Sequence, residues 1–341
     1  MNIAIIVGTR PQYIKLLPLL NEFENQSIKF LIINTGQHYD KSLSTIFFQD
    51  FNIANIKYNL NTNNKSNFNI ADSVNKISKI IKNENSNLVI VFGDCNTTLA
   101  GAIAAKDSEK TLIHIESGLR CGNNKMIEEK NRIKTDKLSD ILFCPSEIAV
   151  KNLYRENIVK NVINTGDIMY DLFLQYKEQF NSKKRDSSYG VLTLHRKENL
   201  SEENLRLRFN QLEKLKNHQL IFPIHPNTER LIAKYKVPIP SNILKIKPLG
   251  WFKLMNYIKG ADFVITDSGG IQKETFWMRK PCITIRNETE WIETINLGVN
   301  VLIKTEDSIK IPEFESKFKN PYGDGRAANK MVDYIINYNN D

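Results

Sequence analysis

Small residues follow an apolar run at residues 263–266, a pattern typical of a strand that ends in a turn and leads into a helix. Ser268, Gly269 and Gly270 lack bulk, so backbone N–H groups at the helix start could approach an anion closely. The positive end of the helix dipole would add to this attraction. Glu274, one turn later, could accept hydrogen bonds from a ribose. The pattern indicates a nucleotide phosphate site, and an ordinary strand-to-helix turn is the alternative.

Two cationic side chains follow the first apolar run, at residues 3–7. Arg10 comes directly after a glycine turn, and Lys15 lies about one turn into the helix that this turn opens. A guanidinium can form paired hydrogen bonds to phosphate oxygens, and an ammonium supplies a point charge. The glycine spacing fits neither a Walker loop nor the dinucleotide fingerprint. We therefore expect phosphate contacts here without a nicotinamide cofactor, unless the segment is a plain turn.

Acidic side chains stand at the ends of further predicted strands in the first half. These positions are Asp94, Glu116, and Glu128 or its neighbour Glu129. Repulsion among converging carboxylates, together with partial burial, would raise the pKa of at least one carboxyl group toward neutrality. Removal of a proton from carbon requires such a group. Arg120 and Arg132 lie close by in the sequence, so structural ion pairs are the alternative.

The second half places histidines at strand ends. His195 follows the apolar run 191–194, where it could act as a general acid or donate a hydrogen bond to a diphosphate. Arg196 adds positive charge beside it. His225 follows the run 220–223 and is either a ligand contact or a turn histidine.

Short apolar runs alternate with helical patterns along the whole chain, as in doubly wound parallel sheets. The predicted strands are 3–7, 30–34, 88–92, 112–115 and 141–143, then 191–194, 220–223, 243–246, 263–266 and 282–285. We predict an α/β fold of two Rossmann-like domains facing a cleft, with ligands beyond the carboxyl ends of the strands. The predicted domains are 1–168, joined by a returning C-terminal helix at 326–341, and 169–325. The linker-like stretch is 181–188.

Length and composition indicate a two-domain protein and argue against membrane, metal-binding and nucleic-acid-binding classes. A length of 341 residues suggests two domains. No apolar run approaches the ~20 residues of a membrane helix, and the chain enters a strand directly, so we expect a cytoplasmic protein that does not bind membranes. The four cysteines lack the paired spacing of a metal site. The net charge is +9, but the lysines are scattered, which argues against nucleic-acid binding.

A series of motifs resembles, in the same order, those of the non-hydrolysing UDP-N-acetylglucosamine 2-epimerases. The motifs are GTRP at 8–11, GD at 93–94, ESGLR at 116–120, EEKNR at 128–132, HRKEN at 195–199, DSGGIQ at 267–272 and NPYGDG at 320–325. The resemblance implies a glycosyltransferase-B-like pair of Rossmann domains, a homodimer, a UDP-sugar substrate, and neither metal nor cofactor.

The resemblance also implies a mechanism. A carboxylate removes the C2 proton while UDP leaves C1, and UDP adds back to the enzyme-bound 2-acetamidoglucal after a proton returns to the opposite face. Asp94, Glu116 and Glu128 match the acid/base carboxylates of the family, and His195 matches its catalytic histidine. The expected substrate contacts are Arg10, Lys15, Arg132, Arg196, Ser268, Gly269, Gly270 and Glu274.

Several positions depart from the family pattern. Gln12 stands where glutamate is usual, Ile127 where proline is usual, and Tyr39, within the segment 36–40, where arginine is usual. Trp291 follows Glu290 where the family has arginine, so stacking area replaces charge. With His225, we expect Gln12, Glu290 and Trp291 to influence substrate choice.

Four other functions remain open from the sequence. A UDP-linked 2-acetamido sugar modified at C3 or C6 could be the substrate of the same reaction. The other three are a hydrolysing 2-epimerase, a glycosyltransferase, and a UDP-sugar sensor without catalysis.

Overall fold

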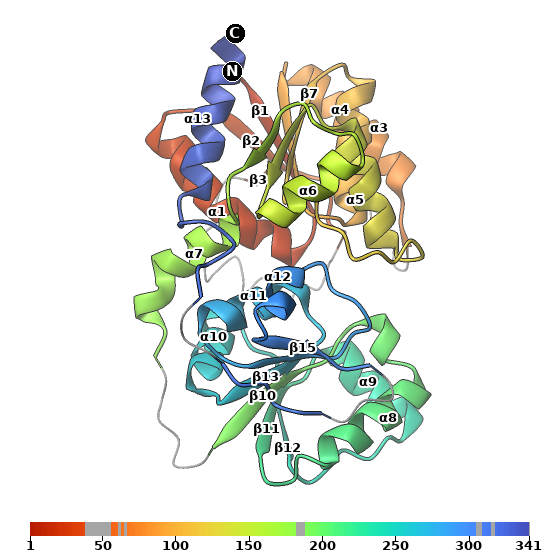
Figure 1. Cartoon of the computed structure of the whole chain (residues 1–341). Coiled ribbons are helices and arrows are strands. Elements are labelled where there is room, and N and C mark those ends of the chain that lie inside the picture. The colour runs from red at the N-terminus through yellow and green to blue at the C-terminus, as the bar shows by residue number, and fades with distance from the viewer. Residues whose placement is uncertain are drawn as a thin grey trace. The chain divides into compact units, whose positions relative to one another are not determined.

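A computed structural model describes residues 1–37, 56–60, 63–64, 67–181, 188–304, 309–314 and 318–340. The chain divides into two compact units, shown in Figure 1. Unit 1 comprises Met1–Gln175 and Asn320–Asp341, and unit 2 comprises Tyr176–Lys319. Residues 38–40 of the segment 36–40 and residues 182–187 of the expected linker lie outside the described residues.

Unit 1 is built on a seven-stranded parallel sheet with the strand order β3-β2-β1-β6-β7-β8-β9. The strands are β1 Ile3–Val7, β2 Phe30–Asn34, β3 Ile56–Asn59, β6 Leu88–Phe92, β7 Thr111–Ile115, β8 Ile141–Cys144 and β9 Val162–Asn164. Every residue of β1 and β6 is buried. Helices cover both faces of a parallel sheet, which is why these strands are apolar throughout rather than alternating. A separate antiparallel pair joins β4 Asn63–Asn64 to β5 Asn67–Phe68.

Seven helices accompany this sheet in the described residues. They are α1 Arg10–Asn25, α3 Ile70–Asn83, α4 Asn96–Asp107, α5 Ile127–Leu138, α6 Glu147–Arg155, α7 Ile168–Tyr176 and α13 Ala327–Asn340. Helices α1 and α3 to α6 connect its strands, α7 follows β9, and α13 comes from the C-terminal segment. Helix α4 packs unusually close to the sheet, because a β-carbon at Gly101 would lie 2.8 Å from Val91 Cγ1 and 3.1 Å from Ile6 Cβ.

The C-terminal helix α13 packs in unit 1, although the whole of unit 2 precedes it in the sequence. Its buried side chains include Met331, Val332 and Ile335, and the Tyr334 ring meets Phe143 edge to face. Asp171 of α7 holds the start of α13, accepting hydrogen bonds from the backbone N–H groups of Ala327 at 3.0 Å and Ala328 at 2.7 Å. Helix starts leave such N–H groups without intrahelical partners, so Asp171 completes this end of the helix.

We predict that Asp171 makes unit 1 less stable as the pH rises from about 4 to 6. Burial raises the pKa of Asp171 to about 6, whereas an unfolded aspartate titrates near ~3.9. The native state therefore binds this proton more tightly than the unfolded state does. This binding stabilises the native state by on the order of 2 kcal/mol below pH ~4, and the stabilisation is lost as the pH rises through the pKa of the folded state. Urea denaturation across this range should show that the free energy of unfolding of the wild type falls as the pH rises, and that it falls less steeply in Asp171→Asn. Equal slopes would contradict the assignment.

Unit 2 contains a six-stranded parallel sheet with the order β12-β11-β10-β13-β14-β15. The strands are β10 Tyr189–Thr193, β11 Gln219–Pro223, β12 Ile243–Ile246, β13 Phe263–Thr266, β14 Cys282–Thr284 and β15 Asn300–Leu302. The helices are α8 Glu202–Glu213, α9 Pro226–Tyr235, α10 Trp251–Gly260, α11 Gly269–Trp277 and α12 Ile292–Asn296. One core of side chains from the strands, α8 and α9 holds the sheet, with Phe209, Phe222 and Phe263 among its largest members.

No helix within the described ranges has both the length and the apolar character needed to cross a membrane.

Candidate functional site

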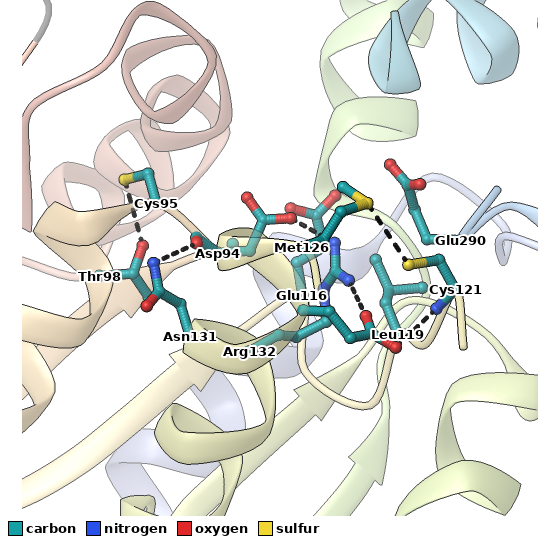
Figure 2. A network of polar contacts seen from close by, with 12 residues as sticks. Asp94, Cys95, Thr98, Glu116, Leu119, Cys121, Met126, Asn131, Arg132 and Glu290 are labelled. Atoms are coloured by element: carbon teal, nitrogen blue, oxygen red, sulfur yellow. Dashed lines mark hydrogen bonds and ion pairs between the residues drawn. The ribbon is translucent and has the colours of Figure 1, made fainter. Parts of the chain in front are cut away.

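Unit 1 carries its candidate catalytic side chains where neighbouring strands end. Strands β1, β6 and β7 are adjacent and parallel, so their carboxyl ends meet at one edge of the sheet. Arg10 and Lys15 follow β1, Asp94 follows β6, and Glu116 follows β7. Figure 2 shows Asp94 and Glu116 in this region, with Asn131 and Arg132 close by. The structure thus groups the cations and carboxylates that the sequence predicted at this edge.

Lys15 and Glu116 form an ion pair in this group. Their side chains are only 14% and 9% exposed. Burial alone would lower the pKa of the Lys15 ammonium, but the Glu116 carboxylate outweighs this, with smaller help from Asp94, and raises the pKa above its usual value. Lys15 therefore stays charged and supplies a fixed positive charge beside a carboxylate.

The backbone around Glu116 is constrained. Glu116 has φ of 73°, a left-handed conformation that non-glycine residues rarely adopt. A β-carbon on Gly93 would lie 3.2 Å from Glu116 Oε2 and 3.4 Å from Lys15 Nζ, so the glycine makes room for the pair. Such strain persists only where surrounding contacts hold it, and it is common at functional sites.

Asp94 is held by helix α5. Arg132 pairs with the Asp94 carboxylate and, at 2.5 Å, with Glu129. Glu129 in turn accepts hydrogen bonds from the backbone of Cys121 at 2.9 Å. The Asn131 side-chain amide donates to the Asp94 carbonyl oxygen at 3.1 Å. Arg132 therefore pairs with a predicted carboxylate, Asp94, as the ion-pairing alternative expected, whereas the cationic partner of Glu116 is Lys15.

Glu128 differs from these two carboxylates. It lies in the first turn of α5 and is partly exposed, next to Ile127, which is 62% exposed. Within the described ranges, no hydrogen bond or ion pair holds its side chain. Of the three predicted acid/base groups, Glu128 is the one least fixed by its neighbours.

Gln12 is integrated into the turn after β1 rather than presented to solvent. Its side chain is buried, and its Oε1 accepts hydrogen bonds from the backbone N–H groups of Gly8 at 2.9 Å and Thr9 at 3.1 Å. Its Nε2 donates to the Phe92 carbonyl at 3.0 Å and to Thr98 Oγ1 at 3.1 Å. An ionised glutamate could not donate these last two bonds. The amide therefore ties the end of β1 to the end of β6.

In unit 2, a buried aspartate fixes His195. Strands β10 and β13 are adjacent, so His195 and Asp267 emerge side by side. Asp267 is fully buried and accepts from the backbone N–H groups of His195 at 2.9 Å and Arg196 at 2.8 Å, and its Oδ1 lies 3.0 Å from His195 Nδ1. Burial would raise the pKa of Asp267, but His195 and the backbone donors lower it below its usual range. The His195 side chain is 45% exposed, so Nε2 is the ring nitrogen left to face a ligand.

Asp267 lies in the motif at 267–272, but the motif alone does not indicate a role for it. Its position directly after an apolar strand, one residue before the small-residue turn, was the available signal. The contact with His195 spans 72 residues of sequence and could not be read from local pattern.

The start of α11 is crowded by a carboxylate. A β-carbon on Gly269 would lie 2.5 Å from Glu290 Oε1, whereas one on Gly270 would meet nothing within 4 Å. Arg286 Nη1 lies 2.9 Å from Glu290 Oε2, and both side chains are buried. The Ser268 N–H donates to Thr266 Oγ1 at 2.9 Å. Glu290 thus lies beside the predicted phosphate-binding turn and carries its own counter-charge.

The remaining predicted residues of unit 2 have local partners. Glu274 is buried and accepts a hydrogen bond from Trp251 Nε1 at 2.7 Å. Trp291 is 3% exposed and the Lys273 ammonium lies 3.7 Å from its ring centroid, so the ring is packed rather than open as a stacking surface. His225 caps α9, its Nδ1 accepting from the Asn227 N–H at 3.2 Å, which is the turn role that the sequence offered as an alternative.

Two glycines in the turn after Glu116 provide a matched test of this geometry. Gly118 and Gly122 both have φ of 78°, but a β-carbon on Gly118 would lie 2.3 Å from the Ala149 carbonyl oxygen, while one on Gly122 would meet nothing within 4 Å. Gly122→Ala should cost only the left-handed strain, about 1–2 kcal/mol. Gly118→Ala should cost at least ~3 kcal/mol in all, because overpacking adds to the same strain. Thermal unfolding compares them, and equal losses would contradict the packing described.

The chain was compared with known proteins. The family model for UDP-N-acetylglucosamine 2-epimerase matches residues 21–336. A UDP-N-acetylglucosamine 2-epimerase homolog from Methanococcus maripaludis is 39% identical over 99% of this chain and 100% of its own length. A UDP-2,3-diacetamido-2,3-dideoxy-D-glucuronate 2-epimerase from Pseudomonas aeruginosa is 34% identical over 98% of this chain and 99% of its own length.

A solved structure gives the same picture of the fold. The crystal structure of UDP-GlcNAc 2-epimerase from Methanocaldococcus jannaschii, in complex with UDP-GlcNAc and UDP, matches with a TM-score of 0.89 at 33% identity, over 99% of this chain and 100% of that one. Together with the two parallel sheets, this match confirms the α/β fold of two Rossmann-like domains expected from the sequence.

Proposed function

This chain belongs to the UDP-N-acetylglucosamine 2-epimerase family, and on that basis we propose that it interconverts UDP-N-acetylglucosamine and UDP-N-acetylmannosamine without net hydrolysis. The family membership confirms the resemblance seen in the motifs. The observation that carries the proposed chemistry is the pair of carboxylates, Asp94 and Glu116, each following one of two neighbouring strands and each matched by a buried or half-buried cation.

The proposed reaction proceeds by elimination and re-addition. The C2–H bond breaks and its proton passes to a carboxylate, while the C1–O bond breaks and its electron pair leaves with UDP, giving 2-acetamidoglucal. A carboxylate then protonates C2 from the other face, and UDP re-forms the bond to C1. Every step is redox-neutral, so the proposal needs no nicotinamide, and we propose no metal.

We assign the groups as follows. Asp94, Glu116 and Glu128 are the acid/base candidates, because the reaction needs a proton acceptor and a donor on opposite faces of C2. The C2 proton is weakly acidic, so stabilising the departing diphosphate carries much of the catalysis. Arg10, Lys15, His195, Arg196 and the turn Ser268–Gly270 supply that stabilisation in our proposal, and Glu274 contacts the ribose. We also propose that the protein acts as a homodimer in the cytoplasm.

A second substrate is favoured by one comparison. The Pseudomonas aeruginosa relative, whose name specifies a UDP-2,3-diacetamido sugar acid, matches nearly the whole chain at an identity close to that of the other relatives. The same 2-epimerisation on a UDP-linked 2,3-diacetamido sugar is therefore the alternative.

Proton NMR in deuterium oxide tests the proposal. Incubation with UDP-N-acetylglucosamine should yield UDP-N-acetylmannosamine carrying deuterium at C2. Free N-acetylmannosamine with UDP would instead show the hydrolysing reaction. Conversion of only the 2,3-diacetamido substrate would establish the alternative. Binding of both UDP-sugars with no exchange at C2 would overturn the enzymatic proposal in favour of a sensor.

A further inference from the structure

We propose that His114 is a buried imidazolium, protonated on both ring nitrogens, and that it is a positioning residue for the two turns that carry Asp94 and Glu116. The charge state is argued from the hydrogen-bond partners of the ring and from the ionised state of Asp136. The consequence for catalysis rests on the proposed function, so the test has a spectroscopic part that is independent of it.

Both nitrogens of His114 face oxygen atoms. His114 lies in β7 and is fully buried. Its Nε2 is 2.8 Å from the Gly93 carbonyl oxygen, and its Nδ1 is 2.6 Å from Asp136 Oδ1. A carbonyl oxygen only accepts hydrogen bonds, so Nε2 must carry a hydrogen.

Asp136 is an acceptor as well. Its Oδ2 accepts hydrogen bonds from Arg120 Nη1 at 2.7 Å and from the Gly118 N–H at 3.2 Å. Burial would raise the pKa of Asp136, but His114 and Arg120 hold it below its usual range. An ionised Asp136 has no proton to give, so Nδ1 of His114 must also donate. A neutral imidazole would leave one of the two contacts without a hydrogen.

The surrounding charges balance such an imidazolium. Arg120 also forms a two-point contact with Glu156, Nε to Oε1 at 2.7 Å and Nη2 to Oε2 at 2.8 Å. The cluster therefore contains two cations, His114 and Arg120, and two anions, Asp136 and Glu156. Buried charges persist when they are paired and fully hydrogen-bonded.

The cluster links the two catalytic turns. Gly93 immediately precedes Asp94, and Gly118 lies two residues after Glu116. The path from the Gly93 carbonyl through His114 and Asp136 to the Gly118 N–H therefore spans both turns with three hydrogen bonds. Removal of the His114 ring would free both turns, and misplacement by about 1 Å can cost a reaction ~100-fold.

Nitrogen-15 NMR of the histidine rings tests the charge state directly. A neutral imidazole has one protonated ring nitrogen, whereas His114 should show two in the folded protein. Its signal is the one missing from His114→Gln, or the one that persists when the other four of the five histidines are replaced. A single protonated nitrogen on His114 would overturn the proposal, whatever reaction the enzyme performs.

Two side-chain replacements test the positioning role. The longer amide introduced by His114→Gln reaches the position of Nε2 and keeps a donor to Gly93, whereas His114→Asn keeps only the donor to Asp136. We expect His114→Asn to lower kcat about 100-fold with KM and UDP affinity nearly unchanged, and His114→Gln to recover at least part of the loss. His218→Gln is the control, because this ring packs on Phe263 in unit 2, and its kcat should not change.

The outcomes separate the two proposals. Unchanged kcat in His114→Asn, or a loss of UDP affinity as large as the loss of kcat, would overturn the positioning role. If the wild type does not epimerise any UDP-sugar offered, the proposed function fails, and the NMR result alone still decides whether His114 is an imidazolium.

Discussion

Asp94→Asn is expected to lower kcat for C2 epimerisation by about 10³, within the range that one general acid–base group contributes. Asparagine has nearly the same shape and can still accept a hydrogen bond from Arg132, so the turn after β6 should keep its place. The amide cannot take up the C2 proton. UDP affinity should stay within a few-fold, since the loss falls on the chemical step. Deuterium incorporation at C2 and calorimetric titration with UDP measure the two effects.

Asp72→Asn provides the matched control for this variant. Asp72 is an exposed carboxylate of unit 1 that pairs with Lys76 at 2.7 Å, and it lies in the first turn of α3. The substitution removes the same charge from the same unit and should leave kcat unchanged. Survival of activity in Asp94→Asn would remove Asp94 from the acid/base set.

Asp267→Asn should lower kcat by about 10²–10⁴, because replacing the carboxylate partner of a catalytic histidine has effects of this size elsewhere. In the wild type, Asp267 accepts from two backbone N–H groups and from the Asn199 amide at 3.2 Å, in addition to its contact with His195. An asparagine at this position would turn an NH₂ group toward one of these donors and would no longer pair with a protonated His195. Steady-state kinetics and UDP titration measure the result.

The variant should also respond differently to acid. The pKa of Asp267 is lowered in the folded state, so its ionised form contributes stability above the unfolded value of ~3.9, and this contribution is lost as the pH falls through the folded value. Asp267→Asn should therefore lose less stability on acidification than the wild type does.

Asp262→Asn is the control at the other end of β13. Asp262 accepts a hydrogen bond from the backbone N–H of Tyr189 at 3.1 Å, just as Asp267 accepts one from His195. Asp262 precedes β13, however, whereas Asp267 follows it. We expect some loss of stability and an unchanged kcat. If both variants lose activity equally, Asp267 acts only through the fold of unit 2.

Continuous apolar runs made the central strands predictable. The runs at 3–7, 30–34 and 88–92 match β1, β2 and β6 residue for residue, because strands buried on both faces contain few polar positions. Three edge strands were missed. β3 alternates between partly buried and exposed residues, and β9 and β15 have three residues each, too few to show a period.

The positions of site residues were predictable for a topological reason, whereas their partners were not. Parallel strands share a carboxyl edge, so Asp94 and Glu116 could be placed together without coordinates. The pairing of His114 with Asp136 depends on which helix packs on which strand, and the pairing of His195 with Asp267 depends on which strands are neighbours in the sheet. The sequence offered ion pairs with Arg120 and Arg132 as the alternative to mutual repulsion of the carboxylates. Arg132 does reach Asp94, but the pairing of Lys15 with Glu116 was not anticipated.

The return of α13 to unit 1 has a consequence for how the protein is made. A ribosome releases residues 176–319, which form the whole of unit 2, before it releases the helix that Asp171 caps. Unit 2 can therefore fold during translation. Unit 1 remains incomplete over this time, because the surface that packs on Met331, Val332 and Ile335 is still exposed. The first unit to be synthesised is thus the last to be finished, and a nascent chain stalled before residue 327 would expose that apolar surface to chaperones.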